Sequence, residues 1–244
     1  MQIPPLPAYP GVESSALSAI TARLLHRRRS FRLDSLRLCA KIVPEIHYLG
    51  LEHLPAHGAL LLTANHYSRA GFSTAWIAAG ISAALPVEVT WIMSNEWLFE
   101  GNSFAFLLRP AMRFVLRSIT LVYNFLPMPT MIPGFSTPQQ RSSSVRQVIE
   151  RLRAQPDLVL GLTPEGMDSP DGGLMLPPAG AGRFIHHLNQ MGLSIVPAAV
   201  HEVDGRLQIR FGKAYDLDQS DSVSPAKLDL LVRQQVMDHI RGCW

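Results

Sequence analysis

Residues 58–68 run Gly58-Ala59-Leu60-Leu61-Leu62-Thr63-Ala64-Asn65-His66-Tyr67-Ser68. A short apolar run that stops abruptly at polar residues is typical of a strand buried on both faces of a parallel sheet. In open α/β sheets, ligands bind beyond the carboxyl ends of the strands. The polar residues 65–68 are therefore candidate parts of a functional site.

A second segment later in the chain has the same pattern. The apolar run 158–162 is followed by Thr163-Pro164-Glu165-Gly166. Because the carboxyl ends of parallel strands meet at one edge of a sheet, His66 and Glu165 are predicted to lie in a single site built from two distant parts of the chain. A histidine and a carboxylate at one sheet edge are suited to acid–base chemistry.

Strands and helices are predicted to alternate along the chain. Strands are expected over 46–49, 58–64, 87–93, 121–125, 158–162, 195–200 and 207–211, and helices over 70–81, 103–118, 142–154, 179–191 and 228–240. Residues 127–134 are expected to form a loop, and His201-Glu202 a turn. This alternation predicts the α/β class, with a mostly parallel central sheet flanked by helices on both faces.

The N-terminal 44 residues form a basic segment with apolar residues at roughly helical spacing. Its cations are Arg23, Arg27, Arg28, Arg29, Arg32, Arg37 and Lys41. A helix is expected from Ser14 or Ser15 to about residue 30, and a second over 33–43. Such a segment suits the surface of an anionic membrane. The alternative is a helical appendage docked on its own domain with its arginines in water.

The bulk composition sets further limits. The 244 residues carry a net charge of +3 and suffice for one large domain over residues 45–244 behind that appendage. No apolar run is long enough to cross a bilayer, and the N-terminus does not have the pattern of a cleaved signal. Cys39 and Cys243 are expected to be free thiols in a reducing cytoplasm. No metal site is expected, and nucleic-acid binding is disfavoured because the basic residues lack interleaved aromatic residues.

At the two strand ends the sequence resembles the glycerolipid acyltransferases. Their first motif, Asn-His-x-Ser-x-x-Asp, is similar to Asn65-His66-Tyr67-Ser68-Arg69-Ala70-Gly71, and their third motif, Phe-Pro-Glu-Gly-Thr-Arg-Ser, is similar to Thr163-Pro164-Glu165-Gly166-Met167-Asp168-Ser169. Glycine-containing segments at 172–174 and 180–182 and the proline-containing strand 195–198 follow in the family's order, so the resemblance spans roughly residues 45–215.

The resemblance implies an acyltransferase fold and transfer of a fatty acyl group from a thioester to a hydroxyl or amine of a lipid-type acceptor. The thioester is acyl-coenzyme A or acyl carrier protein, a co-substrate, and no other cofactor is implied. His66 is the implied general base, since a hydroxyl is a poor nucleophile until a base takes its proton. The implied substrate-binding residues are Asn65, Ser68, Arg69, Gly166 and Ser169. The implied location is the cytoplasm, peripheral on the inner face of the membrane, where lipid acceptors are found.

Two departures from the family pattern bear on the chemistry. Gly71 stands where the family has the aspartate that orients the histidine, so Glu165 or Asp168 is expected to replace it as a catalytic carboxylate. Asp168 also stands where the family has a phosphate-binding arginine. The family's second motif ends in another phosphate-binding arginine, and the nearest stretch here, residues 120–127, contains no arginine. Because like charges repel, the acceptor is expected to be neutral or cationic rather than phosphate-bearing.

Two alternative functions remain open from the sequence. The first is a catalytically silent lipid-binding domain of the same fold, since the orienting aspartate is missing. The second is an acyl-thioester hydrolase, in which water replaces the acceptor. A Gly-x-Ser-x-Gly segment is absent from the sequence, which argues against a serine hydrolase.

Overall fold

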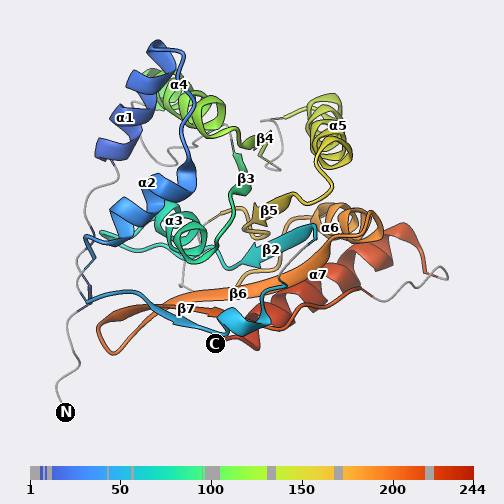
Figure 1. Cartoon of the computed structure of the whole chain (residues 1–244). Coiled ribbons are helices and arrows are strands. Elements are labelled where there is room, and N and C mark those ends of the chain that lie inside the picture. Colours follow the sequence, from blue (N-terminus) through green and yellow to red (C-terminus); the bar gives the residue numbers. More distant parts are fainter. Residues whose placement is uncertain are drawn as a thin grey trace.

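The computed structural model describes residues 6–7, 9, 13–42, 44–55, 58–94, 96, 105–130, 136–167, 173–217 and 223–244, with the main chain alone at 13–16 and 105–107. Its central sheet has the strand order β1-β7-β6-β2-β5-β3-β4 (Figure 1). The strands are β1 (His47–Leu49), β2 (Leu60–Ala64), β3 (Val89–Ser94), β4 (Leu126–Met128), β5 (Val159–Leu162), β6 (Ser194–Val203) and β7 (Arg206–Phe211). Strand β7 is antiparallel to β6 and parallel to β1, and the pairs from β6 to β4 are parallel. The predicted α/β class and mostly parallel sheet are confirmed.

Helices cover both faces of this sheet. They are α1 (Glu13–Leu24), α2 (Phe31–Cys39), α3 (Thr74–Ala84), α4 (Ala105–Tyr123), α5 (Pro138–Ala154), α6 (Ala181–Gln190) and α7 (Pro225–Arg241), with a short 3-10 turn, η1 (Leu51–His53). Leu60 and Leu62 of β2 pack in one core with α3, whereas Leu61 packs in a second core with α5, α6 and α7. Alternate residues of β2 thus point to opposite faces, and both faces are buried, as a continuous apolar run predicts.

Helix α3 begins later than the sequence predicts. The helix expected over 70–81 spans Thr74–Ala84 instead, because the chain after His66 first makes a tight turn. Arg69 and Phe72 exchange two main-chain hydrogen bonds, of 3.1 and 2.9 Å, and Gly71 between them has φ of +82°. That left-handed conformation strains any residue with a Cβ, which explains a glycine at this position.

The prediction of a strand over 121–125 is wrong. Helix α4 continues to Tyr123, and Asn124 then adopts φ of +58° while the Phe125 N–H donates to the Thr120 carbonyl at 2.9 Å. This is the Schellman pattern of a helix C-terminus, with asparagine in the place that glycine usually takes. The strand follows at β4, so residues 127 and 128 of the expected loop are in the sheet. Pro127 is tolerated there because β4 is an edge strand.

The N-terminal helices are shorter than expected. Helix α1 ends at Leu24 rather than near residue 30, and His26 lies beyond it with φ of +52°. Ser30 caps α2, since its hydroxyl accepts from the Leu33 N–H at 3.0 Å. Helix α1 packs on α4 and α2 on α3 (Figure 1). No helix among the described residues is both long enough and apolar enough to span a bilayer.

Candidate active site

The two polar segments meet at the carboxyl edge of the sheet. Strands β2 and β5 are neighbours, paired in parallel with Thr63 opposite Leu162 (Figure 1). His66 and Glu165 follow the last residues of these strands within three positions. The His66 main-chain N–H donates to Glu165 Oε1 at 2.7 Å. The half-buried His66 and the buried Glu165 are therefore held together across 99 residues of sequence, as the two-segment pattern predicts.

Glu165 holds the main chain of the site. Its second oxygen, Oε2, accepts from the Met175 N–H at 2.6 Å, so the carboxylate ties the loop after β5 to the loop after β2. Burial raises the pKa of Glu165, and the hydrogen bonds from Met175 and His66 act in the opposite direction. Each oxygen of Glu165 thus receives a main-chain donor, Oε1 from His66 and Oε2 from Met175, whereas replacement of the orienting aspartate by Glu165 or Asp168 stays a prediction.

The imidazole has a contact that the sequence did not predict. The Thr74 hydroxyl lies 3.3 Å from Nδ1 and 3.4 Å from Nε2 of His66. Thr74 is the first residue of α3, directly after Ser73 at the N-cap. Gly71 in the turn at 69–72 has no side chain to offer the ring, and the first residue of α3 places a hydroxyl there instead.

Asn65 supports the strand end rather than lining an open site. Its side chain is 2% exposed, its Nδ2 donates to the Val200 carbonyl at 2.9 Å, and its Oδ1 accepts from the Val200 N–H at 2.7 Å. The amide therefore continues the hydrogen bonding of β2 to β6 after β2 ends. This placement fixes the residue before His66, whereas substrate binding by Asn65 stays a prediction.

A buried carboxylate secures the other end of the same loop. Glu202 accepts from Arg69 Nε at 2.6 Å and Arg69 Nη2 at 2.5 Å, and from the hydroxyls of Tyr9 at 2.8 Å and Tyr67 at 3.0 Å. Burial raises the pKa of Glu202, but the hydrogen bonds from Arg69 and the two tyrosines outweigh it and hold this pKa below its usual range. Glu202 lies in β6, so the expectation of a turn at 201–202 is wrong.

The remaining predicted site residues have different surroundings. Arg69 is engaged with Glu202 and is also within 3.2 Å of the Pro7 carbonyl, so its predicted substrate contact has to coexist with these bonds. Ser68 is half-buried, and it does not cap α3. Gly166 is exposed with φ of +70°, and a Cβ there would meet no atom within 4 Å. Asp168 and Ser169 lie outside the described residues.

Sequence reasoning missed Thr74 and Glu202 for different reasons. Thr74 became relevant only when the turn displaced the start of α3, and one sequence gives no sign of that displacement. Glu202 had a usable signal, because it is an acidic residue next to an apolar strand. Among the described residues, no group of three or more histidine, cysteine or acidic side chains is arranged to hold a metal ion.

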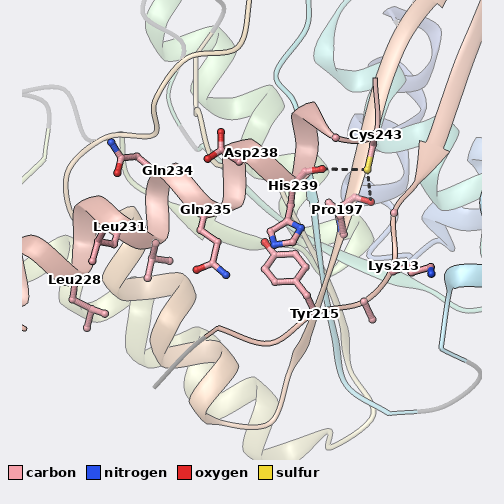
Figure 2. A pocket seen from close by; sticks show the side chains of 14 residues that line it. Pro197, Lys213, Tyr215, Leu228, Leu231, Gln234, Gln235, Asp238, His239 and Cys243 are labelled. Atoms are coloured by element: carbon pink, nitrogen blue, oxygen red, sulfur yellow. Dashed lines mark hydrogen bonds between the residues drawn. The ribbon is translucent and has the colours of Figure 1, made fainter. Parts of the chain in front are cut away.

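A pocket of about 820 Å³ lies elsewhere in the molecule. Figure 2 shows it between α7 and the chain after β7, where the rings of Tyr215 and His239 stack at 3.6 Å. Tyr215 pairs with Ile195 near the start of β6, whereas Asn65 beside His66 bonds Val200. Ile195 and Val200 are five residues apart on β6, which corresponds to about 17 Å along the strand. His66 and Glu165 do not line this pocket.

Comparison with known proteins agrees with this geometry. The family model described as Acyltransferase matches residues 45–201, which is more than half of the chain. The chain belongs to the acyltransferase family. The matched residues include both strand ends of the site, with His66 and Glu165. A search of curated proteins found no match.

Among solved structures, the fold is similar to that of the 1-acyl-sn-glycerophosphate (LPA) acyltransferase PlsC from Thermotoga maritima. The TM-score is 0.52 at 13% sequence identity, with 95% of this chain and 83% of that chain covered. At this identity the likeness establishes the fold, a PlsC-like acyltransferase fold in which helices flank a mostly parallel sheet.

Proposed function

We propose that this chain transfers a fatty acyl group from a thioester, acyl-coenzyme A or acyl carrier protein, to a hydroxyl or amine of a lipid-type acceptor, with His66 as general base. The observation that supports this most is the bond from the His66 N–H to Glu165 Oε1, which joins the two acyltransferase motifs at one sheet edge. The imidazole is half-buried, so it combines a fixed main chain with access from solvent.

The proposed reaction needs one proton carrier. As the acceptor oxygen attacks the thioester carbonyl carbon, Nε2 or Nδ1 of His66 takes the proton of the acceptor hydroxyl. The tetrahedral intermediate then collapses, the bond from carbonyl carbon to sulfur breaks, and the imidazolium returns the proton to the departing thiolate. An ester and a free thiol result, and the enzyme is restored.

In this proposal Thr74 is the positioning residue for the imidazole. Its hydroxyl lies 3.3 Å from Nδ1 and 3.4 Å from Nε2, and a hydroxyl that accepts a hydrogen bond from the N–H of one ring nitrogen leaves the other nitrogen as the base. Thr74 would thereby do part of what the family's aspartate does, without a negative charge to stabilise the imidazolium. We therefore expect a slower reaction than an aspartate-supported histidine gives.

The proposed acceptor is neutral or cationic, such as a sugar, a diol or an amine. The support is Asp168, which stands in the place of the family's phosphate-binding arginine. The test supplies acyl-coenzyme A with phosphate-bearing and phosphate-free acceptors and identifies products by mass spectrometry. Acylation restricted to phosphate-bearing acceptors would overturn this part of the proposal.

The proposed location is the cytoplasmic face of a membrane, bound peripherally. Exposed leucines on and after α1, namely Leu17, Leu24 and Leu25, are 65%, 67% and 57% exposed beside the N-terminal arginines, which suits an anionic lipid surface. Cell fractionation tests this, since a peripheral protein sediments with membranes and is released by high salt or alkali. Recovery in the soluble fraction at low salt would contradict it.

One observation favours the silent lipid-binding alternative, namely Gly71 in the place of the orienting aspartate. The same assay separates the candidates by product. Acceptor-dependent acyl product supports the transferase, and free fatty acid formed without an acceptor supports the hydrolase. Retention of acyl-coenzyme A or fatty acid with neither product supports the silent domain.

A further inference from the structure

A second pocket, of about 310 Å³, lies between α1 and α4, apart from the strand ends that hold His66. Figure 1 shows these two helices side by side. The residues that line the pocket are Arg23, Arg109, Pro110, Arg113, Phe114 and Arg117. Four of these six residues are arginines. Their positive charges concentrate the electrostatic potential on any group bound between them.

Three of the arginines form a single stripe on α4. Arg109, Arg113 and Arg117 are spaced by four residues, which places them on one face about 6 Å apart along the helix axis. Like charges at this spacing repel one another and destabilise the helix. An anion bound between the guanidinium groups removes that repulsion, so the stripe gains stability from a negatively charged ligand.

The fourth arginine comes from α1 and is oriented before any ligand binds. The Arg23 guanidinium lies over the Phe114 ring, 4.6 Å from its centroid, and Arg23 Nη1 donates to the Ser118 hydroxyl at 3.0 Å. Both contacts use α4, and Arg23 is half-buried between the helices. A guanidinium fixed in this way loses less conformational entropy when it binds an anion, and its remaining N–H groups are available to a ligand.

The carboxylate of Glu96 offsets part of this charge. Glu96 pairs with Arg113, with Oε1 2.9 Å from Nη2, and Arg113 remains 60% exposed. Arg117 is exposed on the same stripe, one turn further along α4. Even with Arg113 paired to Glu96, Arg23 and Arg117 give the pocket excess positive charge among the described residues, and neither is tied to the site around His66.

We propose that this pocket is a binding site for a phosphate group. The planar guanidinium donates two parallel hydrogen bonds to a phosphate, and arginines converging from two helices match its several oxygens. Leu121, at the next i+4 position of the same stripe, is 58% exposed, and Phe114 at the pocket is 44% exposed. This apolar surface beside the cations fits the phosphate of a lipid headgroup, and a soluble phosphate offers the same chemistry. The site is independent of acyl transfer by His66.

The test measures binding without turnover. The full chain is sedimented with vesicles of equal parts phosphatidylglycerol and phosphatidylcholine, and with vesicles of phosphatidylcholine alone. Inorganic pyrophosphate is titrated separately by calorimetry. The variant R113Q/R117Q is compared with R146Q/R153Q, whose two arginines are exposed on α5 and give the same change of net charge. Thermal unfolding of each variant checks the fold.

The expected result is that R113Q/R117Q binds the anionic vesicles about 30-fold more weakly than the wild type, while R146Q/R153Q stays within about twofold. Binding of pyrophosphate with the same dependence on Arg113 and Arg117 would assign the site to soluble phosphates, and binding to vesicles alone would assign it to a headgroup. Equal loss in both double variants, or no binding of either probe by the wild type, would overturn the proposal.

Discussion

His66 is held by its main chain and by its ring through different partners. Glu165 accepts its N–H at 2.7 Å, and the Thr74 hydroxyl is 3.3 Å from Nδ1. The first contact fixes the position of the His66 main chain, and in the proposed mechanism the second keeps the proton on one ring nitrogen. This division of roles makes separate predictions for the two partners.

Replacement of Thr74 by valine keeps the shape of the side chain and removes the hydroxyl. We expect the kcat of T74V to fall about tenfold or more with little change in KM, because the proton position on the imidazole is no longer fixed, whereas T74S should retain most of the activity. Steady-state acyl transfer over a range of pH measures both effects. A T74V enzyme with wild-type kcat and pH profile would show that the hydroxyl does not act on the ring.

Replacement of Glu165 by alanine removes the acceptor of two main-chain donors. We expect E165A to lose about 2–6 kcal/mol of folding free energy, since each buried N–H left without a partner costs about 1–3 kcal/mol. Chemical denaturation measures this loss, with E150A on the exposed face of α5 as the control. A stability within error of the wild type would contradict the anchoring role of Glu165.

The loop between β2 and α3 is the element on which the site depends. Its tight turn at 69–72 needs a left-handed residue, and Gly71 has φ of +82°. We expect G71A to lower the free energy of unfolding by about 1–2 kcal/mol, the usual cost of a Cβ in this conformation, and G71N to lower it less because asparagine tolerates it. Denaturation midpoints of the two variants test this, and an unchanged G71A would refute the turn.

The same loop is tied to β6 through Glu202, and this tie depends on pH. Because hydrogen bonds from Arg69, Tyr9 and Tyr67 hold the pKa of Glu202 below its usual range, its stabilisation is fully present above the unfolded-state pKa and is lost as the pH falls through the folded-state pKa. We expect E202Q to be about 3 kcal/mol less stable than the wild type at neutral pH. The gap should close in acid. A gap that stays constant with pH would contradict the ion pair.

The elements show where sequence reasoning succeeded and where it could not. The strands β2 and β5 were predicted because their apolar runs stop at polar residues, and their adjacency followed from the parallel edge rule. The turn at 69–72 and the extension of α4 to Tyr123 were missed. Each depends on one residue with positive φ, Gly71 or Asn124, and the sequence around that residue does not show that it adopts this conformation. Local patterns located His66 and Glu165, whereas their actual contacts depend on how whole loops fold back.

For the whole molecule, the family follows from residues 45–201, and the fold from its similarity to a PlsC acyltransferase. The division into a segment over 1–44 and a domain over 45–244 stays a prediction, since α1 and α2 pack against α4 and α3. The arginine pocket between α1 and α4 could not be inferred in full from the sequence, because Arg23 joins the stripe only through the packing of distant helices.

The rate of acyl transfer by H66A tests the general base most directly. It is measured with acyl-coenzyme A and the best acceptor found for the wild type, and H187A, an exposed histidine on α6, is the matched control. We expect H66A to lose about 10²–10⁴-fold in kcat while its unfolding midpoint and that of H187A stay near the wild type. An H66A protein that folds normally and transfers acyl groups at the wild-type rate would contradict the assignment of His66 as the base.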